Sequence, residues 1–193
     1  EVSGIGPAVL ERLRPHVRAL WQAWPDPERR RFLRHAVRQW DIHRHRIAPG
    51  VAAIVDDMDA AGVFSLQAGR LSRIEARDGR VAIDWMPRGG TPTTTVADVM
   101  VNATGMEKRL SRAPGRLLPA LHARGLVAPG PLDLGLATRG DGEVLDPNGD
   151  VVPGLWTLGA TRIGDLWETI AMPELRGQAE RVAVGVRQSL AGR

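Results

Sequence analysis

The chain has 193 residues, and its 26 Lys and Arg against 22 Asp and Glu give a formal net charge of only +4. A hydrophobic content of 43% excludes a disordered tail, and the absence of Cys excludes a disulfide-stapled miniprotein. No apolar run approaches the roughly 18 residues that span a bilayer, and no leader pattern opens the chain. We therefore expect a cytoplasmic protein with no membrane partner.

The first part of the chain has a helical pattern. Over residues 7–46, apolar side chains recur at steps of three and four, with Arg residues between them. A first helix is expected to end near Trp24, because two prolines follow and disfavour helix before them. We expect a second helix over residues 27–40 and a third over residues 51–61, ended by Gly62.

The pattern then changes to that of strands. Asp78-Gly79 lies between stretches of alternating apolar residues, which predicts a β-hairpin. A second turn is expected at residues 88–92. Residues 96–103 are apolar on both faces, as in a buried central strand.

The rest of the chain alternates helix and strand patterns. Residues 114–125 predict a short helix, 134–150 a turn-rich β segment, 155–158 a buried strand and 174–190 a closing amphipathic helix. This order of elements predicts the α/β class, or an α+β fragment of it.

Gly4-Ile5-Gly6 has the start of a dinucleotide-binding fingerprint, but its context does not fit. Val9 stands where the third glycine is needed, and the three residues before Gly4 are too few for a strand. We interpret the segment as a lead into the first helix.

The densest basic stretch, residues 34–46, admits two interpretations. A solvated helix end and a phosphate site both fit it, and Arg44 and Arg46 are the candidate phosphate contacts. No helix-turn-helix or zinc-finger spacing accompanies the stretch, so we expect no nucleic-acid partner. His43 and His45 have no further ligand at a suitable spacing, so we expect no metal.

Two later segments have the composition of ligand-binding turns. Residues 99–105 form an apolar stretch that ends in Ala-Thr-Gly, where small side chains allow close approach of a ligand or a second backbone. Residues 153–160 form a strand pattern ending in glycine, and residues 167–176 then lead into a helix with Pro173 in its first turn. A helix start of this kind presents free N–H groups and the positive end of the helix dipole. An ordinary tight turn and an ordinary strand-to-helix connection are the alternatives.

Taken in order, these segments resemble the C-terminal half of two-dinucleotide-fold flavoproteins, and more closely the bacterial FAD/NAD(P)-binding protein family of YdhS-like flavoprotein oxidoreductases. The residues that carry the resemblance are 40–49, 68–70, 102–105, 132–136, 158–159, 167–168, 173–176 and 178–179.

The resemblance implies FAD as cofactor, with NAD(P) as a second nucleotide. It implies that the flavin is contacted by Asn102, Ala103, Thr104, Gly105, Gly159, Ala160, Trp167, Glu168, Thr169, Ile170, Pro173 and Glu174. Disulfide-reductase relatives carry a ribityl-binding Asp where this chain has Ala160, so the backbone of Gly159 and Ala160 is the expected contact. No catalytic residue is assigned, because the flavin performs the redox chemistry in such enzymes.

The resemblance also implies an organisation. Residues 1–62 would be a helical segment, 63–103 a β meander with a central strand, and 104–193 the C-terminal part of a Rossmann-like FAD-binding domain. The expected function is that of the C-terminal portion of an FAD-dependent, NAD(P)H-linked oxidoreductase, whose N-terminal dinucleotide-binding half would be its partner in cis. The alternative is a flavoprotein-like module without cofactor that acts as an interaction or scaffold protein, for instance as a homodimer.

Overall fold

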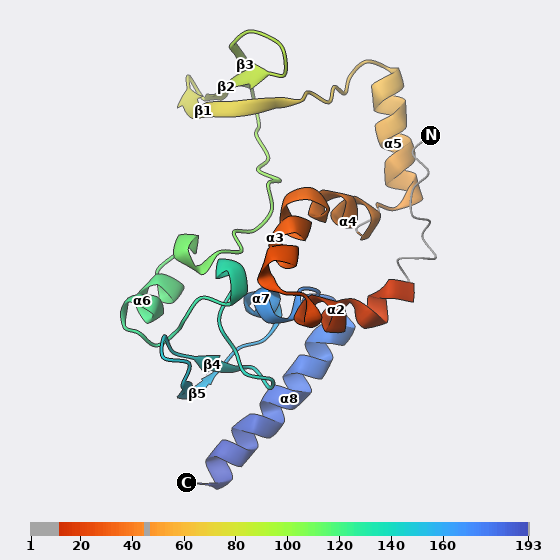
Figure 1. The fold of residues 1–193 in the computed structure, drawn as a ribbon. Helices are drawn as coiled ribbons and strands as arrows, with labels where there is room; N and C mark the ends of the chain where they lie inside the picture. Colours follow the sequence, from red (N-terminus) through yellow and green to blue (C-terminus); the bar gives the residue numbers. More distant parts are fainter. Residues whose placement is uncertain (1–11, 45–46, 193) are drawn as a thin grey trace. The chain divides into compact units, whose positions relative to one another are not determined.

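The computed structural model describes residues 12–44 and 47–192 and confirms the mixed α/β class (Figure 1). The chain divides into two compact units, which we call unit 1 (Glu1–His45 with Met106–Arg193) and unit 2 (Arg46–Gly105). Both sheets are antiparallel, so the Rossmann-like arrangement stays a prediction. Among the described residues, no helix is both long enough and apolar enough to cross a bilayer.

Unit 1 begins with helices. Its N-terminal elements are the 3-10 turn η1 (Arg14–His16) and the α-helices α2 (Val17–Ala23), α3 (Asp26–His35) and α4 (Val37–Arg44). The first helix ends as predicted, since Trp24 is already extended, with ψ 134°, before Pro25.

The second predicted helix is interrupted. Ala36, with φ −119°, separates α3 from α4, although alanine favours helix. Phe32 before the break and Trp40 after it both pack against the same buried cluster. Packing rather than local preference therefore places the break, which is why the sequence pattern missed it.

The second part of unit 1 mixes short helices with one small sheet. Its elements are η2 (Leu110–Arg112), α6 (Leu117–Ala123), η3 (Pro131–Asp133), β4 (Glu143–Leu145), β5 (Val151–Trp156), η4 (Gly159–Arg162), α7 (Ile163–Leu166) and α8 (Met172–Ala191). The short helix at α6 and the closing helix α8 confirm the sequence predictions. The buried strand predicted at residues 155–158 is wrong in position: β5 ends at Trp156, and Leu158 is 41% exposed.

Two hydrophobic clusters form the core of unit 1. The first contains Val17, Trp21, Leu134 and Trp167, and the second contains Leu110, Val127, Leu136 and Val144. The Trp21 indole N–H donates to the carbonyl of Gly164 at 2.7 Å, which joins α2 to α7 across 143 positions of sequence. Trp21 stacks on Trp167 with ring centroids 4.7 Å apart. The first cluster therefore fixes the loop that follows α7.

Unit 2 contains α5 (Pro49–Ala60) and a three-stranded sheet with strand order β1 (Gly69–Arg77), β2 (Arg80–Pro87), β3 (Thr93–Ala97). Gly62 follows α5 with φ +68°, as the sequence predicts. Asp78 (φ 51°) and Gly79 (φ 74°) form the tight turn between β1 and β2, so the predicted hairpin is confirmed.

The predicted central strand over residues 96–103 is wrong. β3 ends at Ala97 and pairs with β2 alone, so it is an edge strand. Val99 and Val101 follow it with no strand structure and are 76% and 82% exposed. A central strand needs a neighbour on each side, but Val96 and Ala97 have only β2, and residues 98–103 form no strand.

Candidate functional site

The segment between α7 and α8, residues 167–170, is held in an unusual backbone conformation. Trp167 has φ 61° and ψ −80°, a region that bulky residues rarely occupy. Its side chain is only 7% exposed; it stacks on Trp21, and Phe32 meets it edge to face at 5.4 Å. Strain of this kind persists when surrounding contacts determine the conformation, and these aromatic contacts do so.

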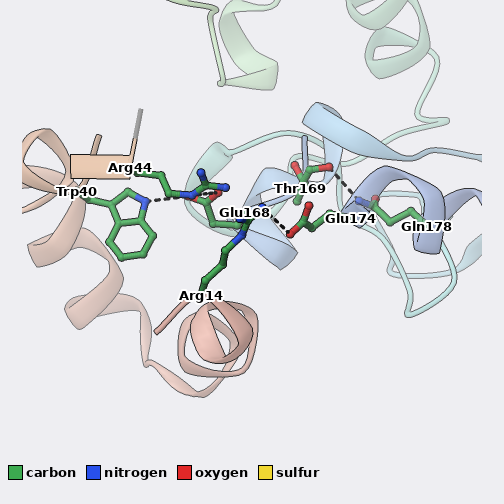
Figure 2. A network of polar contacts seen from close by, with 7 residues as sticks. All are labelled: Arg14, Trp40, Arg44, Glu168, Thr169, Glu174 and Gln178. Carbon is green, nitrogen blue, oxygen red and sulfur yellow. Dashed lines mark hydrogen bonds and ion pairs between the residues drawn. The ribbon is translucent and has the colours of Figure 1, made fainter. Parts of the chain in front are cut away.

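Gln178 joins the two segments of unit 1 that were predicted to contact a flavin. The backbone N–H of Gly159 donates to the Gln178 Oε1 at 3.0 Å. The Gln178 Nε2 donates to the carbonyl of Thr169 at 3.1 Å (Figure 2). Gln178 is 2% exposed, so both bonds are shielded from water. One side chain of α8 therefore fixes the Gly159 turn relative to residues 167–170.

Two side chains of α4 contact the Glu168 carboxylate. Its Oε1 accepts a hydrogen bond from the Trp40 indole N–H at 2.8 Å, and its Oε2 lies 3.6 Å from Nε of Arg44 (Figure 2). The Glu168 and Arg44 side chains are 22% and 21% exposed, so solvent screens this pair less than a surface pair. Both carboxylate oxygens thus help to order the loop.

A cavity of about 200 Å³ lies beside this loop. Five residues predicted as flavin contacts line it, namely Ala160, Trp167, Glu168, Thr169 and Ile170. The rest of its wall is formed by Asp41, Met106, Glu107, Lys108, Arg109, Leu110, Ala113, Pro114, Leu118, Gly135, Leu136, Thr161 and Ile163. The wall is therefore largely apolar, with charged groups of both signs.

Two buried donors at this cavity lack partners. Among the described residues, neither Thr169 Oγ1 nor Trp167 Nε1 has a hydrogen-bond partner, although Thr169 is only 1% exposed. Buried polar groups in folded proteins are almost always hydrogen-bonded, so each exception calls for an explanation. Protein atoms cover both donors in this structure, so a ligand in the cavity would reach them only after a local rearrangement.

The positive charge at the cavity comes from one short segment. Lys108 and Arg109 line the wall, and Lys108 Nζ lies 5.4 Å from the centroid of the Trp167 ring. A cation over an indole face is attracted by the ring quadrupole. The contact therefore holds the ammonium group beside the loop.

The start of α8 has Pro173 in its first turn, as predicted, but it does not line the cavity. Its N-cap residue, Ala171, makes no side-chain cap hydrogen bond, and Pro173 lies in the first turn. Glu174 pairs with Arg14 at 3.9 Å (Figure 2). Pro173, Glu174 and Gly159 are not part of the cavity wall; Gly159 is buried behind it, bonded to Gln178.

The cavity wall includes neither residues 102–105 nor Arg44. Residues 102–105 belong to unit 2 and are exposed, and Asn102 Oδ1 accepts hydrogen bonds from the backbone and hydroxyl of Thr104. Arg44 is engaged with Glu168, and Arg46 lies outside the described residues. Their roles as cofactor and phosphate contacts stay predictions.

Sequence reasoning assigned no role to two residues of this site. Gln178 is among the residues that carry the family resemblance, but its contacts were not predicted; it lies on the inward stripe of α8 between Leu175 and Val182, where a polar residue on an apolar stripe was the available signal. Lys108 gave no signal, because a lone lysine in an irregular segment is usually solvated.

The geometry describes a mixed α/β protein with a small, largely apolar cavity whose wall carries charged groups of both signs and two residues with unpaired buried donors. No family model, curated protein or solved structure matches the chain.

Proposed function

We propose that this chain forms the flavin-facing part of an FAD-dependent, NAD(P)H-linked oxidoreductase, with the cavity beside residues 167–170 receiving part of the flavin. The observation that supports this proposal most directly is that Ala160 and residues 167–170, selected from two separate sequence segments, line one cavity. FAD would supply the hydride and electron chemistry, and the protein would supply position and charge.

The residues present fit such a ligand. An isoalloxazine ring offers a planar apolar body with acceptor atoms at its edge, and the cavity has largely apolar walls to which Thr169 and Trp167, the residues with unpaired buried donors, contribute. Lys108 favours negative charge beside the Trp167 ring, against the Asp41, Glu107 and Glu168 carboxylates on the same wall. Arg44 and Arg46 are retained as proposed contacts to an NAD(P) phosphate.

Thr169→Val tests the proposal with little risk to the fold. The Thr169 hydroxyl has no internal partner, so its loss breaks no protein hydrogen bond, and Val has nearly the same shape. We expect the complete product of the gene to show visible flavin absorption, and Thr169→Val to weaken FAD binding by about tenfold while stability is unchanged or raised.

Gln178→Leu provides a second test, because it would release the Gly159 turn from residues 167–170. Flavin occupancy should fall, whereas Gln188→Leu, at an exposed position of the same helix, should leave it unchanged. A complete gene product that neither contains flavin nor binds added FAD would overturn the proposal, as would equal occupancy in both variants.

The interaction-module alternative has one observation in its favour. A second pocket of about 260 Å³ is almost wholly apolar and is lined by Leu13, Val17, Leu20, Trp21, Trp24, Phe32, Trp40 and Trp167. Leu20 and Trp24 are 42% and 37% exposed. Under this alternative a second copy of the chain would cover the pocket, so light scattering should give a dimer that Leu20→Arg converts to a monomer. If the wild-type chain were monomeric, the apolar pocket would no longer support the interaction-module alternative.

A further inference from the structure

A third pocket, of about 230 Å³, is lined mainly by polar groups and is separate from both sites above. Its wall consists of Arg18, Gln22, Arg29, Pro131, Thr138, Arg139, Gly140, Arg162, Asp165 and Leu166. The wall thus contains four arginines and one aspartate. The four arginines come from four separate places in the chain, namely α2, α3, the turn before β4, and η4.

Arg162 is a buried cation without a direct counter-ion. It is 1% exposed, its Nε donates to the Thr138 hydroxyl at 3.2 Å, and its Nη2 donates to the carbonyls of Arg139 and Gly140 at 3.2 and 3.1 Å. Among the described residues, its Nη1 has no hydrogen-bond partner and no carboxylate lies within ion-pair distance. Burial lowers the pKa of Arg162, and the Arg18 and Arg181 guanidiniums lower it further, although Asp165 and Asp141 act in the opposite direction.

Arg29 is also held in place before any ligand arrives. Its Nε donates to the carbonyl of Trp21 at 3.0 Å, its Nη2 donates to that of Gln22 at 3.1 Å, and its guanidinium lies 5.4 Å from the Trp21 ring centroid. Asp26 pairs with it at 3.7 Å, but the Asp26 side chain is 55% exposed, so solvent screens that pair. A positioned guanidinium loses little rotamer entropy when it binds an anion.

The Asp165 carboxylate would repel an anion, but four arginines outnumber it in the pocket wall. The carboxylate accepts a hydrogen bond from the Thr138 hydroxyl, which in turn accepts from Arg162 Nε. Burial raises the pKa of Asp165, against the lowering effects of Thr138, Arg162 and Arg29. One carboxylate among four guanidiniums leaves the pocket with an excess of positive charge.

We propose that this pocket binds a small dianion of the phosphate class, as the free ion or as a phosphomonoester. Guanidinium groups match phosphate oxygens in bidentate geometry, and a ligand charge would offset the burial of Arg162. The proposal concerns a site distinct from the flavin cavity and does not depend on FAD.

Isothermal titration of the purified chain at constant ionic strength, with inorganic phosphate, ribose 5-phosphate and ribose as probes, tests the proposal. We expect saturable binding of phosphate and no binding of ribose. Tighter binding of ribose 5-phosphate than of phosphate would identify an esterified ligand, whereas equal affinities would identify the free ion. The absence of saturable phosphate binding would overturn the proposal.

Removing a positive charge and removing a negative charge from the pocket should change phosphate affinity in opposite directions. Arg18→Gln should weaken phosphate binding by about tenfold, and Asp165→Asn should strengthen it. Arg30→Gln, on the exposed side of α3, removes the same charge outside the pocket and should have little effect. Arg162 is left unchanged, because its loss would remove the hydrogen-bond donor to the carbonyls of Arg139 and Gly140. If Arg30→Gln weakened binding as much as Arg18→Gln, the attraction would be a general surface effect and the proposal would fail.

Discussion

Unit 1 and unit 2 differ in what holds their elements in place. Unit 1 contains two hydrophobic clusters, and its Trp21 to Gly164 hydrogen bond joins residues 143 positions apart. In the described part of unit 2, Ala82 is the one buried hydrophobic residue, and the elements are close in sequence: one helix and three strands, which are joined at residues 78–79 and 88–92. The comparison indicates that local turn chemistry specifies unit 2, whereas long-range packing specifies unit 1 and its cavities.

The largest expected effect comes from Trp21→Ala. The side chain is 2% exposed, stacks on Trp167 and donates to Gly164, so its removal should lower the free energy of unfolding of unit 1 by about 3–5 kcal/mol. Chemical denaturation measures the loss, and hydrogen exchange of individual peptides locates it.

The same exchange experiment tests the contrast between the units. Peptides from β1, β2 and β3 should keep their protection in Trp21→Ala, because the contacts of Trp21 lie in unit 1. Trp24→Ala, at a position 37% exposed, serves as a control and should cost less. Equal loss of protection in both units would show that they unfold as one cooperative body.

A smaller effect is expected from Gly79→Ala in unit 2. Gly79 has φ +74° in the turn between β1 and β2, and a Cβ there would meet no atom within 4 Å, so the cost is backbone strain alone, about 1 kcal/mol. Exchange of β1 and β2 amides should accelerate while the peptides of α8 stay unchanged. Gly177→Ala in α8, where φ is not positive and a Cβ would meet only the Arg181 side chain at 3.5 Å, is the matched substitution in unit 1. If Gly79→Ala left the β1 and β2 amides unaffected, the turn would not be what specifies the hairpin.

The same contrast explains which features the sequence could predict. The hairpin at Asp78-Gly79, the end of α5 at Gly62 and the long helix α8 follow from local signals: positive φ at turn residues and apolar periodicity. The apolar run over residues 96–103 has the composition of a central strand, but composition does not supply neighbouring strands. The break at Ala36 was likewise invisible locally, since it depends on packing.

The candidate site was predictable in part. Residues 160 and 167–170 were selected from motifs, and they line one cavity. The conformation of Trp167 was not predictable, because a positive φ at tryptophan is intrinsically disfavoured and is held by contacts with Trp21 and Phe32. The arginine pocket could not be predicted either, because Arg18, Arg29, Arg139 and Arg162 are scattered along an arginine-rich chain and only the fold gathers them.

The smallest expected effect is a pH dependence at Asp165 in unit 1. Burial raises the pKa of this carboxyl in the folded chain, so the folded state holds a proton at pH values where the unfolded state has already lost it. Stability must therefore fall as pH rises from the ordinary aspartate pKa through the raised one, since the folded state binds more protons in that window.

Asp165→Asn removes this contribution. In phosphate-free buffer, the difference in unfolding free energy between Asp165→Asn and wild type should grow in favour of the variant across the window. Asp56→Asn, at an exposed position of α5 in unit 2, should run parallel to wild type. Parallel curves for both variants would mean that water reaches the Asp165 carboxylate freely, and that the interior of unit 1 at this pocket is no less solvated than the exposed surface of unit 2.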